Sequence, residues 1–147
     1  MVTPTPGSSP VPPITLGAFE RCEIPLEHWN HSAHVTVAYL LLRAYPAEEA
    51  TRRMCEGVQR YNAAKDIVQT ATGGYHHSMT IAWMRIVRAI LAEQGPGGDA
   101  AAFLDANPFL RCRTLLRLYY SKDRIMSWEC RTAWLEPDLA PLPTART

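Results

Sequence analysis

Prolines and glycines divide this sequence into short segments, and their positions limit what the chain can form. Pro46, the Gly73-Gly74 pair, the breaker at residues 95–98 and Pro137 separate stretches in which apolar residues recur at helical intervals. None of these stretches alternates between apolar and polar residues as a half-buried strand does. The sequence therefore predicts an all-α fold, an irregular bundle of four or five helices.

Residues that start and stop helices give the expected boundaries. Asn30 is a favourable N-cap, and Pro46 ends the first helix because proline disfavours helical geometry in the residue before it. Pro46 also suits the first position of the next helix. Asn107 and Ser121 are expected to cap two later helices. The expected helices cover residues 31–45, 46–64, 75–94, 108–120 and 122–134, with a short helical turn at 100–104.

The composition favours one domain between two tails. A chain of 147 residues that is 47% hydrophobic suffices for a single compact domain. Residues 1–13 include five prolines, so they are expected to be a disordered tail that cannot bury apolar area. Residues 14–143 are expected to form the helical domain, beginning with an irregular lead-in at 14–29, and residues 144–147 a C-terminal tail.

The charge and hydropathy of the sequence argue against nucleic acids and membranes as binding partners. The net charge of +1 provides no basic footprint for nucleic acid or for an anionic membrane. The longest apolar stretch, residues 35–42, is far shorter than the roughly 20 residues that a membrane span needs. The first residues lack the basic start and apolar run of a secretory signal. We therefore expect a cytoplasmic protein whose partner is a small-molecule substrate.

All five histidines fall in two short segments, residues 28–34 and 76–77. Because a helix advances about 100° per residue, His31 and His34 lie roughly 60° apart on one face, which is also the apolar face. His76 is expected to point inward from the helix at 75–94, whereas Ser78, Arg85 and Ala89 are expected on its outer side. A buried imidazole without a hydrogen bond or a metal costs roughly 1–3 kcal/mol. The three rings are therefore predicted to converge on one buried polar site.

A divalent transition metal suits such a site. Neutral imidazole is a common metal ligand, and helical bundles often build metal sites from facing helices. Glu27, and after it Glu20, is expected to add a carboxylate. Iron is the favoured metal, with zinc, copper and manganese as alternatives. The expected metal ligands are His31, His34, His76, Glu27 and Glu20. The expected catalytic residues are the three histidines and Thr80, whose hydroxyl can hold an imidazole in place. Further candidates for the site are His77, Tyr75, Trp83, Tyr39 and Cys22.

The four cysteines form no C-x-x-C pair, so the sequence contains neither a zinc knuckle nor a dithiol redox motif. Cys55, Cys112 and Cys130 are expected to be buried free thiols. Cys22 stands shortly before the histidines, where a thiolate can ligate a metal.

Three functional hypotheses follow from these features. The first is a metal-dependent oxidoreductase acting on a small organic molecule, because no H-E-x-x-H motif provides the base of a zinc hydrolase. The second is a metal-free enzyme or binding protein whose buried histidines transfer protons. The third is a helical interaction module that binds a partner through residues 119–120 and 128–134, with histidines that are only structural.

Several strings resemble a family of small bacterial proteins that is uncharacterised. They are Trp29-Asn-His31-Ser-Ala-His34 and Gly73-Gly-Tyr75-His76, with Tyr120-Ser121, Arg124, Ser127 and Pro137-Asp138-Leu139 further on. The resemblance extends from Phe19 to Pro143 and implies a site at the W-x-H-x-x-H and G-Y-H elements. The family pattern has Glu directly after the G-Y-H histidine, where this sequence has His77, so the resemblance implies an altered ligand set or a tolerant position.

Overall fold

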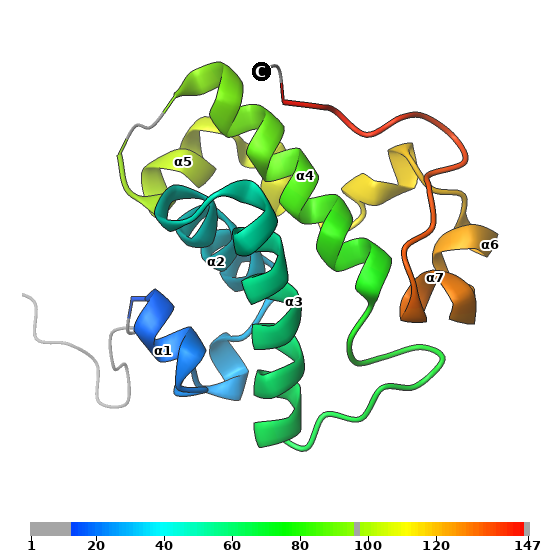
Figure 1. Cartoon of the computed structure of the whole chain (residues 1–147), viewed down its shortest axis with the longest axis horizontal. Coiled ribbons are helices and arrows are strands. Elements are labelled where there is room, and N and C mark those ends of the chain that lie inside the picture. Colours follow the sequence, from blue (N-terminus) through cyan, green and yellow to red (C-terminus); the bar gives the residue numbers. More distant parts are fainter. Residues whose placement is uncertain (1–12, 96–97, 146–147) are drawn as a thin grey trace, which may run out of the picture.

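The computed structural model describes residues 13–95 and 98–145, and over these ranges the chain is helical and has no strand (Figure 1). The predicted all-α fold is therefore confirmed. Residues 1–12 of the expected N-terminal tail and residues 146–147 of the C-terminal tail lie outside the described ranges. The helices are α1 Leu16–Glu20, α2 His31–Ala44, α3 Ala47–Ala64, α4 His77–Gln94, α5 Ala100–Ala106, α6 Lys122–Ile125 and α7 Trp128–Thr132, with 3-10 turns η1 Leu26–His28, η2 Pro108–Arg111 and η3 Leu115–Leu118.

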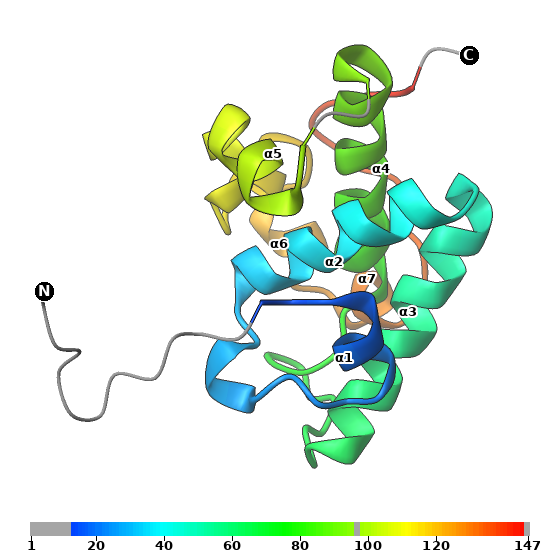
Figure 2. The ribbon, with the colours of Figure 1, turned by 90° about the vertical axis from the view of Figure 1, so that its left-hand side faces the viewer.

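The three longest helices form the centre of the structure. Helix α2 packs against both α3 and α4, and these two also contact each other (Figures 1 and 2). Side chains from all three meet in the core, where Leu41, Tyr61 and Val87 are completely buried. Burying one large apolar side chain contributes about 1.5–3 kcal/mol, so this shared core is the main stabilising contact of the fold.

Local signals for the central helices act largely as the sequence predicts. The Asn30 side chain accepts a hydrogen bond from Ala33 N at 2.9 Å and caps α2. Tyr45 is extended, as expected before a proline, and α2 ends there. Pro46 lies at the N-cap of α3 and is not its first helical residue. None of the helices in the described ranges has the length and hydropathy of a membrane span.

Helix α4 differs from the prediction in its start and in its outer face. It begins at His77, two residues later than expected, with His76 as the N-cap. Ser78 and Ala89 were predicted to face outward, yet both are buried. The chain after α7 explains this difference, because the Ser78 hydroxyl donates to Ala133 O at 2.7 Å and accepts from Leu135 N at 3.0 Å. Helix α4 is thus covered on two sides.

The predicted helices at 108–120 and 122–134 are wrong, because this part of the chain forms short turns and helices. Leu110 and Leu116 are both buried, and a spacing of six residues would place them on different sides of one α-helix. The chain therefore breaks between η2 and η3. Ser121 caps α6 as predicted, but Ser127 interrupts the next segment by donating to Arg124 O and accepting from Cys130 N.

The cysteines are free in the structure, as predicted. Cys55 and Cys130 are buried, whereas Cys112 is exposed. The prediction of a buried Cys112 is therefore wrong, since it lies at the exposed break after η2. The last described residues, 141–145, form no helix and return toward the C-terminal end of α4 (Figure 1).

The contact between α1 and α3 predicts the effect of one substitution. A Cβ atom at Gly57 of α3 would overlap the ring of the buried Phe19. We expect Gly57→Ala to lower the free energy of unfolding by about 1–3 kcal/mol despite the better helix propensity of alanine. Urea unfolding measures this change.

Gly17→Ala is the matched control, because its Cβ would meet only the flexible guanidinium of Arg21. It should leave the stability unchanged or raise it. Equal destabilisation by both variants would contradict the proposed contact.

Candidate functional site

His31 lies in the first turn of α2 and is half-buried. Its Nε2 is 2.8 Å from the main-chain oxygen of Leu110, so this nitrogen carries the proton and donates it. Its ring packs edge-on against Trp83, with the ring centroids 4.6 Å apart. Burial lowers the pKa of His31. The ring is therefore neutral near pH 7, with an unprotonated Nδ1.

His34 lies one turn further along α2 and is also half-buried. Its Nδ1 donates to the main-chain oxygen of Asn30 at 2.8 Å, and its ring packs at a tilt of 32° against Trp29 with the centroids 3.9 Å apart. Burial lowers the pKa of His34, and the nearby His31 acts in the same direction. His34 therefore has an unprotonated Nε2.

The unprotonated nitrogens of these two rings are open to solvent. Among the described residues, the only inaccessible side-chain nitrogen or oxygen without a hydrogen bond is Nε of Arg131. Neither Nδ1 of His31 nor Nε2 of His34 has a hydrogen-bond partner, so each keeps contact with solvent. We call these two rings the imidazole pair. Each ring of the pair thus has one nitrogen lone pair without a hydrogen-bond partner in the described chain.

His76 is buried as predicted, but it acts as a cap. Its Nδ1 accepts from Met79 N at 3.1 Å, and its Nε2 donates to the main-chain oxygen of Ile125 at 2.8 Å. Both ring nitrogens are thus occupied. Within residues 13–95 and 98–145, no three side chains of His, Cys, Asp or Glu lie close enough to hold one metal ion. His31 and His34 lie one turn apart on α2, where their rings contact different partners, and His76 at the start of α4 is not joined to them.

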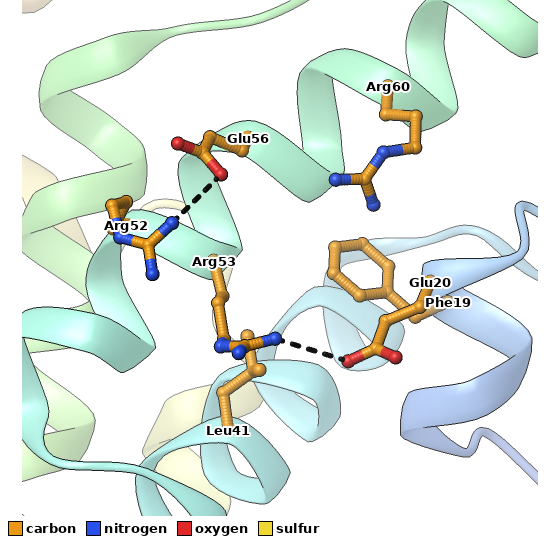
Figure 3. A pocket seen from close by; sticks show the side chains of 7 residues that line it. All are labelled: Phe19, Glu20, Leu41, Arg52, Arg53, Glu56 and Arg60. Atoms are coloured by element: carbon orange, nitrogen blue, oxygen red, sulfur yellow. Dashed lines mark hydrogen bonds and ion pairs between the residues drawn. The ribbon is translucent and has the colours of Figure 1, made fainter.

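Neither of the two predicted carboxylates forms a hydrogen bond or an ion pair with His31 or His34 in the described chain. Glu20 lines a pocket of about 230 Å³ between α1 and α3, where its carboxylate is 3.9 Å from Arg53 (Figure 3). Glu27 is exposed in η1. Cys22, half-buried, follows α1 with a positive φ of 58°. The lining of the pocket is Phe19, Glu20, Leu41, Arg52, Arg53, Glu56 and Arg60.

A second set of polar side chains lies around the start of α4. The hydroxyl of Tyr75 is hydrogen-bonded to Nδ1 of His77 at 2.8 Å. Burial raises the pKa of Tyr75, and its contact with the Cys55 thiol adds to this effect. Thr80 donates to the main-chain oxygen of His76, so it supports the backbone and not the imidazole. The position of Cys55 beside Tyr75 could not be predicted, because Cys55 belongs to another helix, α3.

Three aromatic residues do not lie where the predicted histidine site or the predicted interaction surface would require them. Tyr39, proposed for the site, lies further along α2, where it packs on Phe103 and donates to Gly98 O. In the proposed interaction surface, Tyr120 is completely buried and Trp134 lies beneath Arg85. Trp128 of that surface is 54% exposed.

No protein-family model, no curated protein and no solved structure matches this chain. The resemblance described above stays a prediction. Function must therefore be argued from the chain's own geometry.

The buried histidines predict how stability depends on pH. Histidine in an unfolded chain protonates near pH 6.5, whereas burial lowers the pKa of His31, His34 and His76 in the fold. As the pH falls below about 6.5, the unfolded chain binds protons first, so the free energy of unfolding must fall. Each histidine contributes at most about 1.4 kcal/mol per pH unit.

Urea unfolding at pH 7.5, 6.5 and 5.5 measures this slope. His76→Asn should remove the contribution of one histidine from this slope, because asparagine also caps helices but does not titrate. A slope that is flat or reversed between pH 7.5 and 5.5 would contradict the neutral state of these rings.

Proposed function

We propose that this protein binds a small organic molecule at the imidazole pair and uses neutral imidazole as a proton acceptor. The observation that supports this function is the same on both rings. One nitrogen donates to a main-chain oxygen, of Leu110 or Asn30, and the other nitrogen is unprotonated and accessible. Such a ring is ready to accept a proton near pH 7.

The surroundings of the pair support proton transfer in two ways. When Nδ1 of His31 or Nε2 of His34 accepts a proton, the main-chain oxygen on the opposite nitrogen stabilises the new positive charge. Trp83 and Trp29 pack against the two rings and hold them in place. A positioned acid or base of this kind typically accelerates a reaction by about 10²–10⁴-fold.

A metal-dependent enzyme, with oxidative chemistry on iron favoured, is the second candidate. One observation favours it, because metal-bound histidines usually donate their other N–H to a carbonyl or carboxylate, as His31 and His34 do. In this version Nδ1 of His31 and Nε2 of His34 are the protein ligands. The remaining ligands would come from solvent, from substrate or from a carboxylate such as Glu27 after a rearrangement of η1.

Ligand binding tests the proposed function. A panel of small organic acids, alcohols and amines is screened by thermal shift with the parent chain and with His31→Phe/His34→Phe. We expect compounds that raise the melting temperature saturably in the parent and not in the double variant. His28→Phe is the matched control and should retain every response, since His28 lies outside the pair. Responses that persist in the double variant would refute a site at the pair.

Elemental analysis distinguishes the two candidates. Protein purified without a histidine tag is measured by inductively coupled plasma mass spectrometry, beside His31→Ala, His34→Ala and His76→Asn. Metal-free catalysis predicts less than stoichiometric metal and no effect of a chelator on ligand affinity. Stoichiometric metal that is lost in both alanine variants and kept in His76→Asn would establish the metal-dependent enzyme instead.

A further inference from the structure

Arg131 of α7 is a buried arginine, only 5% exposed. Its Nη1 donates to the main-chain oxygen of Gly73 at 3.1 Å and approaches those of Gly74 and Tyr75 at 3.4 Å. These three carbonyls belong to the loop that leads into α4. One side of the guanidinium is therefore fixed on neutral main-chain oxygens.

The positive charge of Arg131 has no acidic partner. In the described part of the chain, no carboxylate forms an ion pair with it. The loop and helix start at residues 67–79 contain no acidic side chain, and Glu129, on α7 itself, is exposed. Buried charges in proteins are normally paired, because an unpaired one is costly to remove from water. The fold thus holds a charge that an anion would compensate.

The free edge of the guanidinium has the geometry that an oxyanion requires. Nε of Arg131 is inaccessible to solvent and has no hydrogen-bond partner. The Nε–H and Nη2–H bonds of arginine point in one direction and together donate to two oxygens of a carboxylate or phosphate. Nη2 likewise has no hydrogen-bond partner in the described structure. The edge that recognises an oxyanion is therefore the unused one.

The neighbouring helix adds to the positive potential. The loop carbonyls that Arg131 contacts immediately precede His76, the N-cap of α4. Helix α4 has 18 residues, and the N-terminus of a helix favours negative charge. A buried guanidinium and a helix N-terminus that lies close to it in the fold thus both favour a negative charge in this region.

We infer that Arg131 binds the oxyanion group, a carboxylate or a phosphate, of a small molecule between α7 and the start of α4. Nη1 stays on the loop carbonyls, while Nε and Nη2 donate to the anion. Residues 68–72, which precede those carbonyls, are exposed, so this side of the site faces solvent. The inference does not depend on the imidazole pair, and either proposal can fail alone.

Nuclear magnetic resonance of the full chain tests the site directly. The probes are sodium acetate, sodium malonate and inorganic phosphate, each compared with sodium chloride at the same ionic strength. We expect a saturable shift of the Arg131 Nε–Hε cross-peak with a carboxylate or with phosphate, and the effective probe identifies the group. A cross-peak that does not move, or that chloride moves equally, means an adventitious ion only and overturns the proposal.

Substitution provides the second readout. Arg131→Lys keeps the charge but lacks the two parallel donors, so calorimetry should show binding weakened about tenfold or more. Arg85→Lys, an exposed arginine on α4, is the matched control and should bind like the parent. Equal affinity in Arg131→Lys would overturn the proposal. If that variant does not fold, the cross-peak of the parent, assigned by triple-resonance spectra, still decides.

Discussion

Two imidazoles tie the irregular C-terminal half of the described chain to its three central helices. His31 donates to Leu110 O and His76 donates to Ile125 O, across 79 and 49 residues of sequence. The chain between residues 107 and 135 has only short helices and 3-10 turns, so many of its carbonyls have no helical donor. The two N–H groups satisfy such carbonyls in the interior. Both rings are neutral near pH 7, because burial lowers the pKa of His31 and of His76 by disfavouring the charged form.

The sequence predicted the central helices well because their signals are local. Asn30, Pro46 and the glycines before α4 act within a few residues of where they stand. The C-terminal helices were missed because Leu110 and Leu116 are buried by contacts that no helical period describes. The burial of Ser78 depends on a segment more than 50 residues away. Pattern and propensity contain no information on such contacts.

The candidate site could be predicted only in part. The i, i+3 spacing of His31 and His34 places both rings together, because one helix carries them. Whether His76 joins them depends on how α4 packs on α2, and its role as N-cap turns both ring nitrogens to the backbone. Arg131 could not be identified as buried, since an arginine in a short polar helix normally faces solvent. These residues are placed by packing between helices.

The covering of α4 on two sides has a consequence for the order of folding. Its second face meets Ala133 and Leu135, which leave the ribosome long after α4 itself. Until then Ser78 and the residues beside it face water, and the nascent chain resembles a three-helix unit with one open side. Bringing so distant a segment back requires a long loop to close, and the entropic cost rises only slowly with loop length. The last segment can therefore dock late without a large entropic penalty.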